Sequence, residues 1–357
     1  MRSDYRNESY YIEASRNFIS QLFLRQALIT ISTVIPTCDR RESLHRILRS
    51  LAQQSVLPDE VIVVDGSTGR EEHDPAESFP RLNIIYVRTG AAVCVQRNIG
   101  IRRSAGSHIF LCDDDLELPK DYVARIKEFL LQNPKANIAT GLVYEKNEKG
   151  DWAYEYPAAS AGELFWKFIF QQSVWYDIDK TETGYFGGWI LLLMSHFYAT
   201  RGNSYTLAGW PLVTQFTKPV FTTAFYGLGA SVVKKEWLVA SPYDELLDAN
   251  GIGDNYGVAL HFPELPAIHV LTELPVYHHK EEANRLSGAE SYYRRGLALQ
   301  YFMHGSTRFT GANRMLFVWS LLGNWAAFLA KRNWEYLRAA NRLFKAIVLR
   351  NNPYLRR

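Results

Sequence analysis

The strongest indication of the fold is the stretch Ile109-Phe110-Leu111-Cys112-Asp113-Asp114-Asp115, an apolar run that ends in three consecutive carboxylates. An apolar run of this kind predicts a buried strand, and open α/β sheets bind ligands at the carboxyl ends of their strands. Neighbouring carboxylates repel one another, so a bound cation would stabilise such a cluster. Alternate side chains of an extended segment point the same way, so Asp113 and Asp115 are expected to serve one site. An acidic surface turn is the alternative, and the preceding strand disfavours it.

Strands and helices are expected to alternate around this run. The sequence predicts buried strands at residues 29–35, 61–64, 82–87 and 138–144, and helices at residues 41–54, 92–104 and 119–132. Strands that alternate with helices in this way are typical of a parallel sheet covered by helices. We therefore expect the α/β class, with a doubly wound, mostly parallel sheet.

The composition is that of a globular protein with an uneven distribution of charge. The chain has 357 residues, of which 47% are hydrophobic and 22% are charged. Its formal net charge of +3 is too small to indicate a nucleic-acid partner. Residues 331–357 nevertheless contain eight basic residues and one acid, and such a basic segment suggests an anionic partner.

Several features of the sequence bear on its location in the cell. The three cysteines, Cys38, Cys94 and Cys112, are widely spaced and match no zinc pattern, which favours a reduced cytosolic compartment. Residues 1–21 are polar and mixed in charge, unlike a secretory signal. The apolar stretches 185–198 and 315–330 are interrupted by polar residues or glycines and fall short of the roughly 18 uninterrupted apolar residues that a spanning helix needs. We expect a cytoplasmic protein, peripheral on the inner face of the plasma membrane.

Four motifs follow one another along the first part of the chain. They are Val34-Ile35-Pro36-Thr37-Cys38-Asp39-Arg40, then Val61-Ile62-Val63-Val64-Asp65-Gly66-Ser67, then Gln96-Arg97-Asn98-Ile99-Gly100 before Ala105-Gly106-Ser107, and last Phe110-Leu111-Cys112-Asp113-Asp114-Asp115. Each motif alone is weak, but their order and spacing resemble the family 2 glycosyltransferases, which have the GT-A nucleotide-sugar fold. The resemblance is close over residues 29–145 and looser over residues 220–280. It implies an enzyme that takes its sugar from a nucleoside diphosphate sugar.

The resemblance implies a group of residues that bind the donor. Asp65 occupies the place of an aspartate that accepts a hydrogen bond from the ring N–H of the base, and an ionised carboxylate is suited to that role. The family usually has two aspartates before Gly-Ser where this chain has one, and an Asx-turn or helix cap is the structural alternative for Asp65. Arg97 matches the arginine of the family's Arg-Asn element, with a salt bridge between helix and sheet as its alternative. The other residues expected to contact the donor are Pro36, Thr37, Asp39, Asp113 and Asp114.

A divalent cation is implied by the same resemblance. Asp115 would hold Mg²⁺ or Mn²⁺ against the diphosphate, because both the carboxylate and the phosphates offer hard oxygen ligands. Asp113 would face the ribose or the donor sugar and lie close to the same cation. Of the adjacent His278 and His279, only one can face the site if both lie in a strand, and we expect His278 to reach the metal. A purely structural histidine is the alternative.

A catalytic base is expected near Pro242-Tyr243-Asp244-Glu245-Leu246. Inverting members of the family place a carboxylate after a stretch that resembles this one, usually as a Glu-Asp pair. This chain has Gly253-Asp254, so Asp254 is the candidate for deprotonating the acceptor hydroxyl. Asp244 and Glu245 are the alternatives, and a turn-forming acidic pair is the favoured interpretation of both.

The remaining sequence bears on the acceptor. Residues 152–225 are rich in aromatic side chains, which stack on sugars, although core packing explains any single one of them. Residues 315–330 and 334–348 combine apolar and basic character, as does a helix on an anionic membrane surface. A helical pair that closes the domain, or a dimer interface, is the alternative.

These expectations divide the chain into four parts. Residues 1–27 form an N-terminal adaptor with a helix over 12–26, residues 28–150 the nucleotide-sugar-binding half, residues 151–287 the acceptor-side half with the base, and residues 288–357 C-terminal amphipathic helices with basic character. We predict an inverting, metal-dependent glycosyltransferase that acts on a glycan or lipid-linked acceptor in surface polysaccharide or glycolipid synthesis. The alternatives are a nucleotidyltransferase, which usually has a glycine-rich phosphate loop that residues 36–41 lack, and a non-catalytic membrane scaffold.

Overall fold

The computed structural model describes residues 29–69, 74–147, 149–154, 160–178, 188–216, 218–247, 249–280 and 286–356. The adaptor expected at residues 1–27, with its helix, lies outside the described residues.

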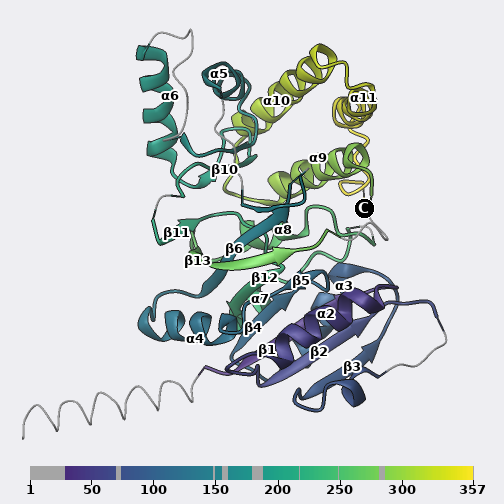
Figure 1. Ribbon diagram of the computed structural model, residues 1–357. Helices are drawn as coiled ribbons and strands as arrows, with labels where there is room; N and C mark the ends of the chain where they lie inside the picture. The colour runs from purple at the N-terminus through teal and green to yellow at the C-terminus, as the bar shows by residue number, and fades with distance from the viewer. Residues whose placement is uncertain are drawn as a thin grey trace, which may run out of the picture.

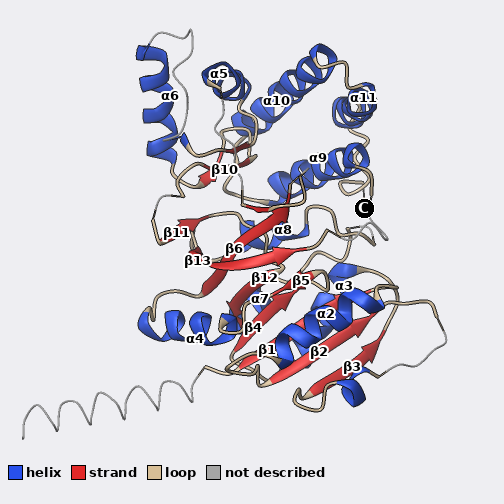
Figure 2. Cartoon of the chain, in the orientation of Figure 1, coloured by secondary structure: helices blue, strands red, loops and turns tan. Residues whose placement is uncertain are grey.

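A ten-stranded sheet forms the centre of the molecule (Figures 1 and 2). Its main path runs in the order β11-β13-β6-β12-β4-β1-β2-β3, while β5 and β7 pair beside it with β13 and β6. The strands are β1 (Ile31–Thr37), β2 (Glu60–Asp65), β3 (Ile84–Arg88), β4 (His108–Cys112), β5 (Leu116–Glu117), β6 (Ile138–Lys146), β7 (Trp152–Ala153), β11 (Val220–Thr223), β12 (Ala230–Lys234) and β13 (Ile268–His278). Strands β1 to β4 pair in parallel, and β12 enters antiparallel between β4 and β6. The predicted α/β class with a mostly parallel sheet is confirmed.

Helices cover both faces of this sheet, and two hydrophobic cores result. The first core lies under α2 (Arg41–Ala52) and α4 (Tyr122–Gln132) and includes alternate residues of β1, β2 and β4. The second core lies under α3 (Val93–Arg103), α7 (Lys235–Ala240), α8 (Asp254–His261) and α9 (Gly288–Gly305). Strand residues alternate between the two cores, with Ile35 in one and Val34 in the other, as the two-residue period of a strand requires.

The chain between β7 and β11 forms a smaller unit that begins with α5 (Ala161–Phe170). The sequence predicts one helix over residues 163–175, but the helix ends at Gln171, which has a left-handed backbone with φ of 51°. Residues 174–175 instead form β8 (Val174–Trp175), which pairs with β10 (Pro211–Val213) beside β9 (Ser204–Tyr205). Helix α6 (Gly188–Arg201) completes this unit, whose own apolar cluster includes Leu164 and Tyr198.

The last third of the chain is helical, with α9, α10 (Gly311–Ala330) and α11 (Trp334–Val348) lying above the sheet (Figure 1). Leu337, Leu343 and Ile347 of α11 are buried in the packing of α11 against α9 and α10. The apolar stripe of α11 therefore closes the domain, which is the helical-pair alternative for residues 334–348. Among the described residues, no helix combines the length and the apolarity needed to span a membrane.

Candidate active site

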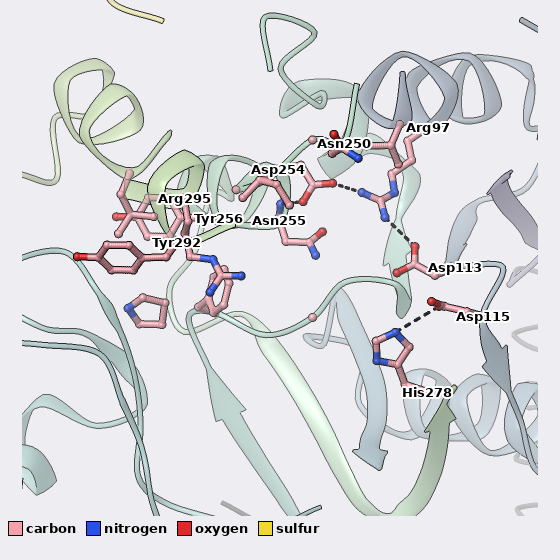
Figure 3. A pocket seen from close by; sticks show the side chains of 18 of the residues that line it. Arg97, Asp113, Asp115, Asn250, Asp254, Asn255, Tyr256, His278, Tyr292 and Arg295 are labelled. Carbon is pink, nitrogen blue, oxygen red and sulfur yellow. Dashed lines mark hydrogen bonds and ion pairs between the residues drawn. The ribbon is translucent and has the colours of Figure 1, made fainter. Parts of the chain in front are cut away.

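A cavity of about 1010 Å³ opens at the carboxyl ends of β1 and β4 and continues between the helices of the C-terminal part (Figure 3). Of the residues expected in the site, Pro36, Thr37, Arg97, Asp113, Asp114, Asp115, Asp254 and His278 all line it. They come from β1, α3, α8 and β13 and from the loop that follows β4, so the fold gathers in one place residues that are far apart in the sequence.

The end of β1 is fixed by a buried amide of α3. The Nε2 atom of Gln96 donates hydrogen bonds to the backbone oxygens of Thr37, at 2.7 Å, and of Val64, at 2.8 Å. These bonds satisfy the last carbonyls of two neighbouring strands, where the sheet opens into the cavity. Pro36 and Thr37 are thereby held at the cavity wall. Gln96 is the first residue of the third sequence motif, but only the fold reveals that it joins two strands.

Asp39 and Asp65 are not among the residues that line the cavity. One carboxylate oxygen of Asp65 accepts a hydrogen bond from the backbone N–H of Ser67 at 2.7 Å, and the other accepts one from the Tyr86 hydroxyl at 2.5 Å. The Ser67 contact is the Asx-turn named as the alternative for Asp65. Asp39 has a φ of 52° and accepts from the backbone N–H of Thr68. Their contact with the donor base stays a prediction.

The three consecutive aspartates have three different sets of partners. Asp113 accepts from the Nη2 atom of Arg97 at 2.7 Å, whereas Asp114 accepts from the Thr37 hydroxyl at 2.7 Å and from Arg40 at 3.2 Å. Asp115 lies 3.3 Å from the Nε2 atom of His278 and 3.7 Å from the Nη1 atom of Arg40. Burial raises the pKa of Asp114 to about 6, although its hydrogen bond from Thr37 acts against this rise.

Strand pairing explains why His278 lies beside Asp115. Strand β5, which follows the aspartates directly, pairs antiparallel with the end of β13, and Leu116 lies opposite His278. Burial opposes the charged form of His278, but hydrogen bonds to Asp115 and Glu145 raise its pKa to about 9. The ring of His279 contacts Glu117 at 2.9 Å and does not line the cavity. Only one of the two adjacent histidines therefore faces the cavity.

Asp115 and His278 form a donor set that fits a divalent cation. A carboxylate oxygen and an imidazole nitrogen both suit Mn²⁺, and the carboxylate suits Mg²⁺. Asp113 is turned toward Arg97 instead, and no group of three or more metal-binding side chains occurs among the described residues. The protein would thus supply two ligands, and the remaining positions suit phosphate oxygens and water.

Arg97 connects the strand that carries the aspartates to the candidate base. Its guanidinium contacts Asp113 at the end of β4 and makes a second ion pair with Asp254 at the start of α8 (Figure 3). The arginine is 5% exposed, and its guanidinium lies 5.0 Å from the centre of the Tyr243 ring. Burial opposes the charge of Arg97, but Asp254 and Asp113 raise its pKa above the ordinary value. Arg97 therefore lines the cavity and also forms the salt bridge that was named as the alternative to a donor-binding role.

Asp254 is the first residue of α8, and the backbone before it explains the missing glutamate. Gly253 has a φ of 99°, which L-residues rarely adopt, and a Cβ atom at this position would lie 2.6 Å from the Cβ of Ala298. Glycine is thus required at position 253 by the turn that leads into α8. Burial raises the pKa of Asp254, although Arg97 acts against this rise.

The two other candidate bases have partners away from the cavity. Asp244 accepts a hydrogen bond from the Tyr301 hydroxyl at 2.7 Å, and Glu245 accepts one from Asn98 at 2.9 Å. Neither carboxylate lines the cavity. Asp254 is therefore the one member of the three that lines the cavity.

Sequence reasoning missed four charged or aromatic residues that line the cavity: Arg40, Glu145, Lys167 and Tyr292. Arg40 is the last residue of the first motif and could have been found because it lies three residues after Thr37. Glu145 ends β6 opposite His278, but that register depends on pairing between distant strands. Lys167 and Tyr292 lie in helices α5 and α9, and the sequence does not determine which face of each helix borders the cavity. Arg295, also on α9, was expected either to help hold phosphates or to belong to a solvated basic face, and it lines the cavity.

Comparisons with known proteins match the chain to glycosyltransferases. The model of the family described as Glycosyl transferase family 2 matches residues 32–199. A protein of Haemophilus influenzae named as an uncharacterized glycosyltransferase is 33% identical over 109 residues, which are 30% of this chain and 36% of that protein. A PGL/p-HBAD biosynthesis glycosyltransferase of Mycobacterium bovis BCG is 27% identical over 220 residues, covering 59% of this chain and 83% of that protein.

Solved structures support the fold. The crystal structure of Staphylococcus aureus TarS 1-349 in complex with UDP-GlcNAc superposes with a TM-score of 0.51 and 15% identity, covering 89% of this chain and 81% of that one. The chain spans about a third of the length of the first curated relatives, 36% of one and 32% of another. The match to the family model and the shared fold together show that the chain is similar to glycosyltransferase family 2 over residues 32–199 and has the GT-A fold.

Proposed function

We propose that this chain is an inverting, metal-dependent glycosyltransferase that uses a nucleoside diphosphate sugar. The observation that carries the proposal is that one cavity is lined by Asp115 and His278 at one position and by Asp254 at another. Arg97 and Asp113 lie between these two positions. A transferase needs both positions in one cavity, because the leaving diphosphate and the attacking hydroxyl lie on opposite sides of the anomeric carbon.

At the donor end, Asp115 and His278 would hold a divalent cation together with the diphosphate. When bound, the cation supplies positive charge that offsets the charge developing on the departing diphosphate. Arg40 lies 3.7 Å from Asp115, so its guanidinium can also approach a phosphate oxygen. Pro36 and Thr37 form the wall that a nucleoside would contact.

At the acceptor end, Asp254 would take the proton of the attacking hydroxyl. Burial raises the pKa of this carboxylate, which brings its basicity closer to that of an effective proton acceptor near neutral pH. Arg97 holds the carboxylate in place through its ion pair and would stabilise the ionised form before each turnover. Attack from the side of Asp254, away from the diphosphate, inverts the anomeric configuration.

The acceptor is proposed to be a glycan or a lipid-linked sugar used in surface polysaccharide or glycolipid synthesis. Trp175, Trp210 and Phe225 line the same cavity beyond Asp254. Aromatic faces of this kind suit the C–H surfaces of sugars.

The products distinguish this proposal from its rivals. Incubation with UDP-, GDP- and dTDP-sugars and Mn²⁺ is expected to release the nucleoside diphosphate from one donor, by transfer or by slow hydrolysis. Pyrophosphate release would instead indicate a nucleotidyltransferase, and no release from any donor with any acceptor would indicate a scaffold. Asp115→Asn serves as the inactive control, and chromatography of the nucleotides is the measurement.

A surface of exposed apolar side chains, here called the aromatic helix face, supports a membrane partner. It consists of Trp166 and Ile169 of α5, Trp189, Leu192 and Leu193 of α6, and Met315, Trp319, Leu322, Trp325 and Leu329 of α10. Trp189, Leu192 and Met315 are 71%, 72% and 76% exposed, and α5 packs against both α6 and α10. Figure 1 shows these helices together at the end of the molecule opposite β1–β3.

Charge beside this face favours an anionic bilayer. The exposed Lys331 and Arg332 follow α10 directly. Tryptophan and basic residues together at one surface suit the interface of an anionic membrane. The chain is thus proposed to act in the cytoplasm on the inner face of the plasma membrane.

Vesicle binding tests the aromatic helix face. The double variant Trp189→Ser, Leu192→Ser is expected to bind vesicles of phosphatidylglycerol and phosphatidylcholine at least about tenfold more weakly than the wild type, since each side chain contributes roughly 1.5–3 kcal/mol when buried in an apolar medium. Val239→Ser is the matched control, because Val239 is 59% exposed but lies on α7. Co-sedimentation measures the binding. Equal binding by all three proteins would reject the membrane proposal.

A further inference from the structure

The cavity has a second cationic position at its far end, on α9. Tyr292, Arg295 and Leu299 are spaced three and four residues apart, so one face of this helix borders the cavity. Figure 3 shows Arg295 and Tyr292 on the opposite side of the cavity from Asp115 and His278. Arg295 therefore lies away from the proposed position of the donor diphosphate.

Charge is divided between the two ends of the cavity. Its five lining acids belong to the donor end and its border with α8: Asp113, Asp114, Asp115, Glu145 and Asp254. The far end, built from α5, β8, β10, α9 and α10, contributes the cations Lys167 and Arg295 and, within the described residues, no acid. This end is thus positively charged and complements an anion.

Arg295 differs from neighbouring arginines in having no internal anion. Among the described residues it makes no hydrogen bond or ion pair, whereas Arg294 contacts Glu290 at 3.0 Å on the same helix. Lys167 already has partners, since its Nζ donates to the Ser173 backbone oxygen at 3.1 Å and lies 3.9 Å from a carboxylate oxygen of Glu163, so Arg295 is the cation available to an anion. The Arg295 side chain is exposed and lines the cavity, so its guanidinium is accessible to a ligand there. An accessible guanidinium without an internal anion can form charge-assisted hydrogen bonds with a bound oxyanion.

We propose that Arg295 binds a phosphate group carried by the acceptor. The planar guanidinium can donate two parallel hydrogen bonds to a phosphate. Trp175, Phe328 and Leu299 line the cavity beside it, and their apolar surfaces suit a chain or sugar attached to that phosphate. The inference rests on the proposed function, because it assigns this end of the cavity to the acceptor. The phosphate would come from a phosphorylated lipid or from a phosphorylated glycan.

Calorimetry with defined probes tests this assignment. The probes are farnesyl phosphate, farnesol, glucose 1-phosphate and inorganic phosphate, titrated into the full chain in metal-free buffer. The wild type is expected to bind one of the two phosphate esters and to bind farnesol more weakly than farnesyl phosphate. A preference for farnesyl phosphate indicates a lipid source, and a preference for glucose 1-phosphate indicates a glycan source; either preference supports the phosphate site.

Neighbouring variants provide the controls. Arg295→Gln is expected to weaken binding of the preferred phosphate ester by about tenfold or more, the loss expected for a charge-assisted hydrogen bond. Arg295→Lys should retain part of the affinity, and Arg294→Gln should bind as the wild type does. UDP with Mn²⁺ should bind equally to all four proteins and should leave the phosphate ester bound.

Three results would overturn the assignment. In the first, the wild type binds farnesyl phosphate and farnesol with equal affinity and does not bind glucose 1-phosphate. In the second, Arg295→Gln binds the phosphate ester as tightly as the wild type does. In the third, Arg295→Gln also loses affinity for UDP. Failure of the proposed function has a different signature, since the wild type would then bind no nucleoside diphosphate at all.

Discussion

Asp254→Asn is expected to lower the turnover number by roughly 10²- to 10⁴-fold, which is the usual contribution of a general base. Asparagine retains the shape of the side chain but cannot accept the proton of the acceptor hydroxyl. Binding of the nucleoside diphosphate should change little, because Asp115 and His278 are untouched. Steady-state rates with the active donor, compared with calorimetric affinities for its nucleoside diphosphate, separate the two effects.

Asp244→Asn is the matched control for this variant. Asp244 lies in the stretch Pro242–Leu246 that precedes Asp254, but it hydrogen-bonds to Tyr301 outside the cavity. The Asp244→Asn variant should retain a turnover number close to that of the wild type. A larger loss in Asp244→Asn than in Asp254→Asn would transfer the role of base to Asp244.

The pH profile gives a second test of the same role. Burial raises the pKa of Asp254 above the ordinary aspartate value, so the carboxylate protonates at a higher pH than a solvent-exposed aspartate would. The rate should therefore fall as the pH is lowered through this raised pKa. Asp254→Asn should lose that acidic limb, whereas Asp244→Asn should keep it.

Arg97→Met is expected to lower the free energy of unfolding by about 3–5 kcal/mol, the range for breaking a buried ion pair by removing one partner. The arginine is 5% exposed and contacts two carboxylates, so its removal leaves both Asp113 and Asp254 without their cation. Arg97→Lys should cost less, because it keeps the charge but loses the guanidinium geometry that reaches both acids. Chemical denaturation measures these changes.

Arg102→Met is the control on the same helix. Its side chain is 63% exposed and lies 3.8 Å from Glu245, so the loss should stay below about 1 kcal/mol. If Arg97→Met and Arg102→Met lose the same free energy of unfolding, the buried bridge that Arg97 forms between β4 and α8 stabilises the protein no more than an exposed ion pair does. In addition, adding Asp254→Asn to Arg97→Met should recover part of the stability, because one unpaired carboxylate is removed.

The strands that build the donor end could be predicted from local sequence. The apolar run before the aspartates forms β4 over His108–Cys112, as expected, because a fully buried strand requires a continuous apolar run. The helix predicted at residues 41–54 is confirmed as α2 over Arg41–Ala52. The helical spacing of its leucines and isoleucine is a local feature, so this helix can be predicted without knowledge of distant contacts.

Features that depend on distant contacts could not be predicted in the same way. The three aspartates are adjacent in sequence, yet the partners that separate their roles come from β1, α3 and β13. Whether the apolar side of a C-terminal helix meets protein or solvent is likewise a property of the packing: α11 buries its stripe, while α10 leaves part of its apolar surface exposed. Residues 174–175 became a strand because β10 offered a partner.

Gly253 illustrates how a departure from a motif can be misleading. In the sequence it weakens the assignment of Asp254, because the family usually has glutamate there. In the structure its φ of 99° and its closeness to Ala298 explain the glycine by backbone geometry. The glycine is therefore no argument for a degenerate site.

The central claim is that the acidic end of β4, together with His278, binds a divalent cation along with the donor diphosphate. Calorimetric titration of UDP, GDP and dTDP, with Mn²⁺ or with EDTA, tests it most directly. Asp121→Asn is the control, because Asp121 is an acid outside the cavity whose side chain is 55% exposed and contacts Arg125. We predict that one nucleotide binds at least about tenfold more tightly with Mn²⁺, that Asp115→Asn removes this gain, and that Asp121→Asn keeps it. Equal affinity with and without Mn²⁺, or a full gain in Asp115→Asn, would contradict the account.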